Sequence, residues 1–302
     1  MSDSRLISVI IPTHNRFALL ERAVRSVLVQ THSTLEILIA DDASSDETPE
    51  LVSKLKAQDT RVKGLRVEAN IGAAAIRNRA LDIAKGRYIC FLDDDDEWYP
   101  EKLERQLPFA DAYSIVGCLS RRVDGYAVAG MVDVDTSSRK KWPQSAKPSL
   151  KEISLNDVFF NNGRLSPSNV MVRRDLLVGV GGFDESLVAS QGRDLFVRLV
   201  HQYGAACLIE EQLCKHYQRH SLPRISTSRN HLIGGWAEFR KNAPLMSKRL
   251  RHWRLFLMSM RESKFSDKYS QKLSWILKAL LHVRLWRLKE HAKVFASQTI
   301  LK

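Results

Sequence analysis

The chain has 302 residues, 44% of them hydrophobic, and a formal net charge of +13. This length can bury a large core in one long domain or in two shorter ones. The four cysteines, Cys90, Cys118, Cys207 and Cys214, are widely spaced and include no Cys-x-x-Cys pair, which predicts reduced core thiols and argues against a zinc site.

The N-terminus leads directly into an apolar run, without the basic and apolar regions of a secretion signal. No stretch approaches the roughly 18 uninterrupted apolar residues of a membrane span. We therefore expect a cytoplasmic protein.

The positive charge is concentrated in the last third of the chain. Residues 1–214 contain 27 Lys and Arg against 30 Asp and Glu, whereas residues 215–302 contain 20 against 4. Such a tail suits an anionic partner, either nucleic acid or the anionic inner leaflet of a membrane. The alternative is a solubilising helical surface.

Strand and helix patterns alternate through the first part of the chain, which is typical of a mostly parallel sheet covered by helices. Short polar joints separate the segments, and a continuous apolar run such as 7–13 suits a strand buried on both faces. The expected strands are 7–13, 36–40, 62–69 and 87–92, and the expected helices are 17–30, 48–57, 73–85 and 101–109.

The middle of the chain is less regular. Residues 113–134 predict strands joined by a turn at Asp124-Gly125, and the polar, basic residues 135–148 predict a mobile loop. The elements expected after this loop are helices at 155–160 and 194–203, strands at 168–172 and 205–210, and a turn at 179–182.

From about residue 230 the pattern is purely helical, with Trp, Phe and Leu residues set among Lys and Arg. Basic amphipathic helices with aromatic residues on their apolar side are typical of proteins that bind membrane surfaces. The alternative is that these aromatic residues pack against the front domain.

Five successive acids, Asp93 to Glu97, follow the expected strand 87–92. Neighbouring carboxylates repel one another, so the cluster costs stability unless a cation lies among them. Hard divalent ions such as Mg²⁺ and Mn²⁺ take carboxylate oxygens together with water and substrate phosphates. The cluster therefore predicts a metal site, and the alternative is a solvated acidic turn.

A second acid pair, Asp41-Asp42, ends another expected strand, and a parallel sheet would bring both acid groups to the same edge. Asn70 and Arg77 lie between them in the sequence. A carboxylate can accept a hydrogen bond from a base, and an arginine can bind phosphate, so these residues predict a nucleotide-diphosphate site. No phosphate-loop or dinucleotide fingerprint follows the first strand, which argues against an NTPase or a dinucleotide oxidoreductase.

In their order and residues, five segments of the chain resemble glycosyltransferase family 2, an inverting family with the nucleotide-sugar-binding GT-A fold. The resemblance implies an α/β fold with a mixed sheet flanked by helices. It also implies a GT-A domain over 1–228, with a nucleotide-binding half (1–112) and an acceptor half (113–228), followed by a basic amphipathic helical region (229–302). The matching segments are 8–16, 37–46, 70–78, 86–100 and 181–185.

The resemblance implies roles for residues of the nucleotide half. Pro12 and His14 would line the nucleotide pocket, Asp42 would contact a uracil-type base, and Asn70 and Arg77 would contact base or diphosphate. The alternative for His14 is capping of the turn after the first strand, and for Arg77 it is a solvated helix position.

The resemblance also assigns the acid cluster. Asp93 and Asp95 occupy the outer positions of the family's Asp-x-Asp motif. Asp95 is the first choice for a ligand of Mn²⁺ or Mg²⁺, together with Asp93, and Asp94 is expected to contact the sugar or the ribose.

The catalytic base departs from the family pattern. An acidic pair is usual shortly after the Gly181–Glu185 turn, but Gln191 and Gly192 stand there, and Asp194 is the nearest carboxylate. Inverting transfer needs a base to accept the proton of the acceptor hydroxyl, so we assign this role to Asp194. The alternative for Asp194 is an acid favoured by the N-terminal dipole of a helix.

Three further residues are assigned by the resemblance. Ser168 lies on a strand expected to border the acceptor pocket. His220 matches a histidine of a later loop, and either His220 or Arg224 would close over the diphosphate.

Together these observations predict an inverting, metal-dependent transferase that moves a hexose or N-acetylhexosamine from a UDP-sugar to a glycan. The basic tail favours a lipid-linked acceptor at the inner face of the cytoplasmic membrane, as in O-antigen, capsule or lipopolysaccharide assembly, with no nucleic-acid partner. One rival is a metal-dependent phosphodiesterase or nuclease. The other is a non-catalytic relative that kept the nucleotide pocket and lost its base.

Overall fold

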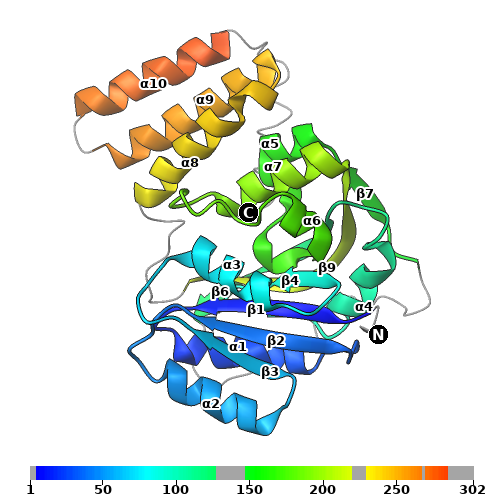
Figure 1. Cartoon of the computed structure of the whole chain (residues 1–302). Helices are drawn as coiled ribbons and strands as arrows, with labels where there is room; N and C mark the ends of the chain where they lie inside the picture. The colour runs from blue at the N-terminus through cyan, green and yellow to red at the C-terminus, as the bar shows by residue number, and fades with distance from the viewer. Residues whose placement is uncertain (1–4, 127–146, 220–228, 267–268, 285–302) are drawn as a thin grey trace. The chain divides into compact units, whose positions relative to one another are not determined.

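The computed structural model describes residues 5–126, 147–219, 229–266 and 269–284 (Figure 1). The chain divides into two compact units. The first holds the residues up to 158 together with 162–186 and 192–222, and the second holds 159–161, 187–191 and the residues from 223 onward. The predicted domain limits at residues 112 and 228 stay a prediction.

The first unit is an α/β fold built on a mixed sheet. Its strands are β1 (Ile7–Thr13), β2 (Leu35–Asp41), β3 (Val62–Arg66), β4 (Tyr88–Phe91), β5 (Asp96–Trp98), β6 (Val116–Tyr126), β7 (Leu150–Ile153), β8 (Val170–Arg173) and β9 (Ala206–Arg219). They lie in the order β3-β2-β1-β4-β8-β6-β9-β5, and β7 also pairs with β9. The first four strands pair in parallel, and β8 is antiparallel to both of its neighbours.

The helices before residue 220 cover this sheet or connect its strands. They are α1 (Phe17–Leu28), α2 (Thr48–Gln58), α3 (Ala73–Ile83), α4 (Lys102–Gln106), α5 (Leu155–Asn161), α6 (Arg174–Gly179) and α7 (Gln191–Tyr203), with short 3-10 turns η1 (Leu107–Phe109), η2 (Asn162–Arg164) and η3 (Pro167–Asn169). The alternation of strands and helices expected for the first part of the chain is confirmed.

The order in which the chain adds its parallel strands reverses after β3, and we call the position between β1 and β4 the β1–β4 reversal. The chain moves from β1 to β2 to β3 and then returns through α3 to β4, on the other side of β1. Because parallel crossovers are right-handed, this reversal places α3 on the face opposite to α1 and α2, as Figure 1 shows. Ligands of such sheets bind beyond the carboxyl ends of the strands at the reversal, which here lies between β1 and β4.

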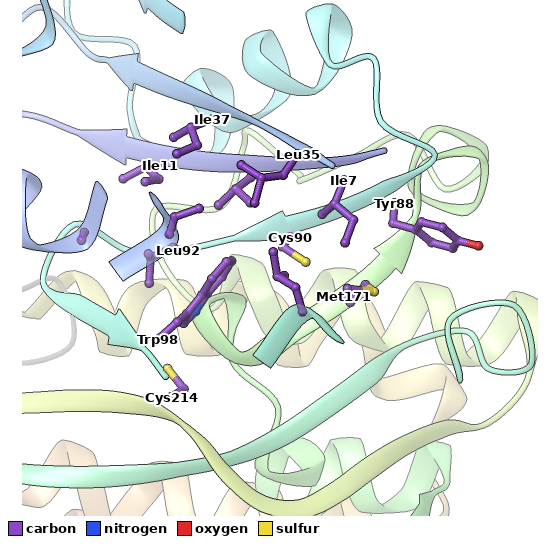
Figure 2. Packing of buried hydrophobic residues seen from close by; sticks show 14 of the residues in the cluster. Ile7, Ile11, Leu35, Ile37, Tyr88, Cys90, Leu92, Trp98, Met171 and Cys214 are labelled. Carbon is purple, nitrogen blue, oxygen red and sulfur yellow. The ribbon is translucent and has the colours of Figure 1, made fainter. Parts of the chain in front are cut away.

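Alternate residues of the central strands form one core with α1. Successive side chains of a strand point to opposite faces, so the odd-numbered residues of β1 and β2 share a face. All of them are less than 5% exposed. Figure 2 shows this cluster continuing across β4 to β8 and β5; it includes Ile7, Val9, Ile11, Leu35, Ile37, Ile39, Leu20, Val24, Cys90, Leu92, Trp98 and Met171.

All four cysteines are buried and free, which confirms the prediction of reduced core thiols. Burial raises the pKa of the Cys90 thiol to about 11. These thiols are therefore protonated at neutral pH and act as small apolar side chains.

The structure corrects the turn expected at Asp124-Gly125. Both residues lie inside β6, which runs parallel to β9. The register between the two strands shifts between Val123 and Tyr126, where Asp124 and Gly125 stand. A glycine inside a strand often marks such an irregularity, so the dipeptide that is typical of hairpins forms a bulge here.

Three short elements have no counterpart in the sequence prediction: β5, β7 and α6. The two strands both pair with β9, which is distant in sequence. The predicted mobile loop at 135–148 falls outside the described residues, except for its last two positions.

The second unit is helical, as expected, with α8 (Arg229–Asn242), η5 (Ala243–Leu245), α9 (Lys248–Phe265) and α10 (Tyr269–Arg284). Three of its described tryptophans pack within the unit: Trp236 lies 6.4 Å from Trp275 between ring centroids, and Trp253 stacks on Phe160 at 5.4 Å. Trp253 is only 1% exposed. Among the described residues, no helix combines the length and apolar character needed to cross a membrane.

Candidate active site

The carboxyl ends of β1, β2 and β4 bring the predicted site residues to one edge. The Asp42 amide donates to the Thr13 carbonyl at 2.9 Å, so the loop after β2 lies beside the end of β1. On the other side, the Thr13 hydroxyl donates to an oxygen of Asp94 at 2.9 Å. The sheet therefore joins both acid groups at the reversal, as the sequence predicts.

The loops after β1 and β2 hold each other in place. The Nδ1 atom of His14 lies 2.7 Å from the carbonyl oxygen of Asp42, and Oδ1 of Asn15 accepts from the Ser45 amide at 2.7 Å. Asn15 and Ala43 adopt positive φ angles of 54° and 60°. A left-handed alanine is strained, and the hydrogen bonds between the two loops maintain it. His14 is exposed, and Pro12 is buried within β1.

Asp42 organises the turn that carries Asn70. Its two carboxylate oxygens accept from the amides of Ile71 at 2.7 Å and Gly72 at 2.9 Å, and the residue is 4% exposed. Gly72 has a φ of 87°, a conformation that favours glycine, and directly precedes α3. Asp42 thus fixes the turn, which presents Asn70 to solvent. The predicted contact of Asp42 with a base is not tested by these bonds.

Two arginines of the same chain pair with three of the acids after β4. Arg77 of α3 lies 2.5 Å from Asp93, and Arg16 lies 3.1 Å from Asp94 and 3.6 Å from Asp95. The expectation that a metal must resolve the repulsion was therefore incomplete, because the chain supplies cations itself. Arg16 was missed as a site residue, although a cation directly after the first strand stands at the same edge as the acids.

Asp94 differs from its neighbours in its surroundings. It is 5% exposed, and burial raises the pKa of its carboxyl to about 7, with the Arg16 charge acting in the opposite direction and Asp95 adding to the rise. Asp94 is turned toward Thr13 and Arg16. The predicted contact of Asp94 with the sugar or the ribose stays a prediction.

Carboxylate oxygens of Asp93, Asp95 and Asp96 lie within 4.8 Å of one another. Such a set of oxygens fits a hard divalent cation, which binds carboxylates and completes its shell with water and phosphate. This trio is the candidate metal centre in the part of the chain that the structure describes. Asp96 was not predicted as a member, because it begins the unpredicted strand β5.

A network of buried charges contacts the acid loop, by which we mean residues 93–97 after β4. Arg22 of α1 donates to the Asp95 carbonyl at 3.0 Å and pairs with Glu97 at 2.7 Å. The Tyr217 hydroxyl donates to Glu97 at 2.8 Å, and Lys215 lies 3.5 Å from it. The side chains of Arg22, Glu97 and Lys215 are all less than 10% exposed, so buried ion pairs anchor the loop.

Ser168 lies directly against the acid loop. Its hydroxyl accepts from the Asp93 amide at 3.1 Å, and its carbonyl accepts from the Trp98 indole at 2.6 Å. Nearby, the Nε2 atom of His216 lies 3.3 Å from Asp96 and 3.3 Å from the Ser166 hydroxyl. These residues border the acids on the side of η3 and β9.

The Gly181–Glu185 turn docks on α3 through Asn78. The Asn78 amide group donates to the Phe183 carbonyl at 2.9 Å and to Glu185 at 2.8 Å, and it accepts from the Phe183 amide at 2.8 Å. A Cβ on Gly182 would come within 2.6 Å of the Asn78 oxygen, so only glycine fits. The turn therefore serves the fold, and Asn78 is the partner that sequence reasoning did not assign.

The comparison with known proteins decides the family. Residues 8–179 match the family described as glycosyl transferase family 2. The chain belongs to this family. The WcaA protein of Escherichia coli K12, provisionally named a colanic acid biosynthesis glycosyl transferase, is 30% identical over 291 residues, which cover 94% of this chain and 96% of WcaA.

Two further similarities bear on the site and the fold. The Escherichia coli protein WfaP, named a UDP-Glc:alpha-D-GlcNAc-diphosphoundecaprenol beta-1,3-glucosyltransferase, is 41% identical over 110 residues, which cover 36% of this chain and 43% of WfaP. The structure of Staphylococcus aureus TarS residues 1–349 with UDP-GlcNAc has a TM-score of 0.59 and 20% identity, and the match covers 94% of this chain and 77% of that one. At this identity the likeness shows the fold alone, and the predicted GT-A fold is confirmed.

Asp194, the base assigned to this glycosyltransferase, lies in the first turn of α7. It is 0% exposed, and its Oδ2 accepts from the Nε of Arg198 at 2.8 Å. Arg198 also donates to the Val180 carbonyl at 2.6 Å, so the pair ties α7 to the residues after α6. This environment suits a positioning carboxylate, and the role of base stays a prediction.

The remaining predicted residues, His220 and Arg224, fall outside the described residues. Gln191, which stands where the family usually has an acid, donates to the Leu187 carbonyl at 2.7 Å and begins α7.

Proposed function

We propose that this glycosyltransferase is an inverting, metal-dependent enzyme that transfers a hexose or an N-acetylhexosamine from a UDP-sugar to a glycan acceptor. The observation that best supports the proposal is the meeting of two features at the β1–β4 reversal. One is the turn held by Asp42, and the other is the acid trio of Asp93, Asp95 and Asp96. A nucleoside diphosphate needs a hydrogen-bonding edge for its base and cations for its phosphates.

The choice of a UDP-sugar is supported by relatives. WfaP is named for a UDP-Glc donor, and the TarS structure contains UDP-GlcNAc. From these donors we infer that the nucleotide is UDP and that the sugar is either a hexose or an N-acetylhexosamine.

For the acceptor, we propose a lipid-linked glycan in the assembly of a bacterial surface polysaccharide such as O-antigen, capsule or lipopolysaccharide. WfaP is named for a diphosphoundecaprenol-linked acceptor and WcaA for colanic acid biosynthesis. The basic helices of the second unit support work at the inner face of the membrane, because anionic lipids attract clusters of Lys and Arg.

In the proposed mechanism, Asp93 and Asp95 would hold Mn²⁺ or Mg²⁺, with Asp96 as a third carboxylate. A bound ion would supply positive charge to offset the negative charge of the departing diphosphate. Arg77 contributes a guanidinium beside Asp93, where it can also pair with a phosphate oxygen. Asn70 presents its amide to the base or diphosphate, while Asp94 is assigned to the sugar or ribose.

Proton removal from the acceptor hydroxyl is assigned to Asp194, while Ser168, whose hydroxyl accepts from the Asp93 amide, is assigned to the acceptor side of the acid loop.

The first test is thermal stabilisation of the full chain by UDP with Mn²⁺, followed by transfer of labelled sugar from a panel of UDP-sugars to a lipid-linked acceptor fraction. We expect stabilisation that depends on the metal, and transfer from one donor class. Stabilisation by oligonucleotides instead of UDP would contradict the proposal and favour the nuclease alternative.

A second candidate function is favoured by Gln191-Gly192 and by the buried ion pair of Asp194. It is a non-catalytic relative that binds nucleotide sugar without transferring it. Slow hydrolysis of the UDP-sugar in the absence of acceptor would exclude this candidate, whereas tight UDP binding with neither hydrolysis nor transfer would support it.

A further inference from the structure

Helix α10 exposes a continuous row of aliphatic side chains, which we call the leucine ridge: Leu273, Ile276, Leu277, Leu280 and Leu281. Each is between 37% and 61% exposed. Their spacing of three and four residues places them on one face of a helix that has 3.6 residues per turn. A face of this kind in water is unusual for a surface helix and indicates a binding partner.

The opposite face of α10 packs on α9, so the ridge is not the side by which the helix joins its unit. Ala279 is fully buried, Trp275 is half-buried, and Nδ1 of His282 lies 3.4 Å from Nδ1 of His252 in α9. Figure 1 shows the two helices lying side by side. The ridge residues are separated from this packing face by about half a turn.

The helices of the second unit are strongly basic. The described residues 229–266 and 269–284 contain 12 Lys and Arg against 2 Glu. Both glutamates are engaged inside the unit, because Glu238 pairs with buried Arg254 at 2.5 Å and Glu262 accepts from the Trp236 indole at 2.8 Å. Lys272 and Lys278 of α10 are exposed on either side of the ridge.

We propose that the leucine ridge of α10 inserts into the surface of an anionic lipid bilayer, with the surrounding lysines and arginines at the headgroups. This inference rests on the proposed function for its purpose, since it would hold the enzyme beside a lipid-linked acceptor. It also differs from the sequence expectation, because Trp236, Trp253 and Trp275 pack inside the unit and the aliphatic residues of the ridge face outward.

The combination of an aliphatic row with flanking cations selects this partner over others. A bilayer offers an apolar interior for the leucines and negative headgroups for the lysines, whose long side chains can reach the interface. A nucleic acid would contact the cations but leave the leucines in water. A second copy of the chain would cover the leucines but bring like charges together.

The test compares binding of the full chain to vesicles made of equal parts phosphatidylglycerol and phosphatidylcholine, and to vesicles of phosphatidylcholine alone. The ridge variant is Leu277→Ser/Leu280→Ser. The matched control is Ile233→Ser/Leu245→Ser, which changes two exposed aliphatic residues of the same unit outside α10, at 54% and 39% exposure. Circular dichroism and melting temperature check that both variants keep their helices.

We expect the parent and the control to bind the anionic vesicles much more strongly than the neutral ones. The ridge variant should lose about tenfold or more in affinity, because two leucines no longer leave water. Equal affinity of the ridge variant and the parent would overturn the proposal, as would equal binding of the parent to both kinds of vesicle.

Two other results would assign the ridge to a different partner and overturn the proposal as well. One is a dimer of the parent in solution that becomes a monomer in the ridge variant. The other is oligonucleotide binding that the ridge variant loses. Stabilisation by UDP with Mn²⁺ is measured on the same samples, so a failure of the ridge and a failure of the transferase proposal are seen separately.

Discussion

The two units of this protein use charge in opposite ways. At the sheet edge of the first unit, acids meet cations of the same chain, as Arg77 meets Asp93 and Arg22 meets Glu97. The described helices of the second unit contain 12 Lys and Arg but 2 Glu, and both glutamates interact with residues of the same unit. Paired, buried charges hold a site in one conformation, whereas an unbalanced surface calls for a partner outside the chain.

The largest effect is expected from removing the acids themselves. The variant Asp93→Ala/Asp95→Ala should lower transfer by on the order of a thousandfold, because the diphosphate loses its cation site. It should also lose the stabilisation by UDP that depends on Mn²⁺. The measurements are initial rates and melting temperatures with and without the metal.

The matched control for this variant is Asp59→Ala/Asp175→Ala, which removes two acids from surface pairs with Arg61 and Arg173. It should transfer sugar at the parental rate. Undiminished transfer by Asp93→Ala/Asp95→Ala, or by the parent in excess chelator, would show that a metal at these acids is not required.

The next largest effect concerns the buried network below the acid loop. Glu97→Ala leaves Arg22 and Lys215 buried without their shared carboxylate, so we expect a loss of about 3–5 kcal/mol in the free energy of unfolding. Denaturant titration measures it. Glu21→Ala breaks an exposed pair with Arg25 and should cost at most about 1 kcal/mol. Similar losses of unfolding free energy in Glu97→Ala and Glu21→Ala would contradict the expected difference between buried and exposed ion pairs.

Much of the first unit could be predicted from its sequence because the signals there are local or follow from topology. Continuous apolar runs predicted the parallel strands, and the edge rule predicted that the acids after β2 and β4 meet. The features that could not be predicted depend on pairing between strands that are far apart in the sequence. Nothing near Asp124-Gly125 indicates that β9 will pair along the whole of β6, and nothing near Asp96 announces the short strand β5.

The charge balance of the site was hidden for a similar reason. The acids after β4 suggested that an ion is needed, but their nearest cations come from residues 16 and 77, which only the fold brings close. In the second unit, composition gave the basic helices, yet the helical pattern did not indicate which apolar residues face inward. Packing of Trp236 on Trp275 decides that the aromatic side is internal.

A moderate effect on kcat is expected at Asp194, and it distinguishes the two roles considered for this residue, catalytic base and positioning residue. If it is the base, Asp194→Asn should lower kcat by roughly a hundredfold or more while UDP affinity stays unchanged. Arg198→Gln is the comparison, because it breaks the same ion pair and leaves the carboxylate in place. Equal losses of stability in both variants with parental kcat would make Asp194 a positioning residue and send the search for the base elsewhere.

The smallest effect is expected in the free energy of unfolding at Glu36. This residue lies at the amino end of β2, where its ion pair and hydrogen bonds serve stability alone. Glu36 accepts from the Ser8 hydroxyl at 2.6 Å and from the Lys85 amide at 2.6 Å, and it pairs with Lys63 at 2.5 Å. Burial acts to raise the pKa of Glu36, but these donors outweigh it, so the pKa lies below its ordinary value. Stability from this group is therefore complete above the unfolded pKa of about 4.3 and is lost as pH falls through the lower folded value.

Glu36→Gln should accordingly reduce the free energy of unfolding at neutral pH by about 1 kcal/mol and flatten its decline in acid, as urea titrations at several pH values would measure. The control Glu68→Gln changes an exposed glutamate and should leave both the stability and its slope unchanged. UDP affinity should not change in either variant, because Glu36 lies at the amino end of β2, away from the acid edge. An unaltered slope in Glu36→Gln would mean that another carboxylate, nearer the site, determines the acid stability of the first unit.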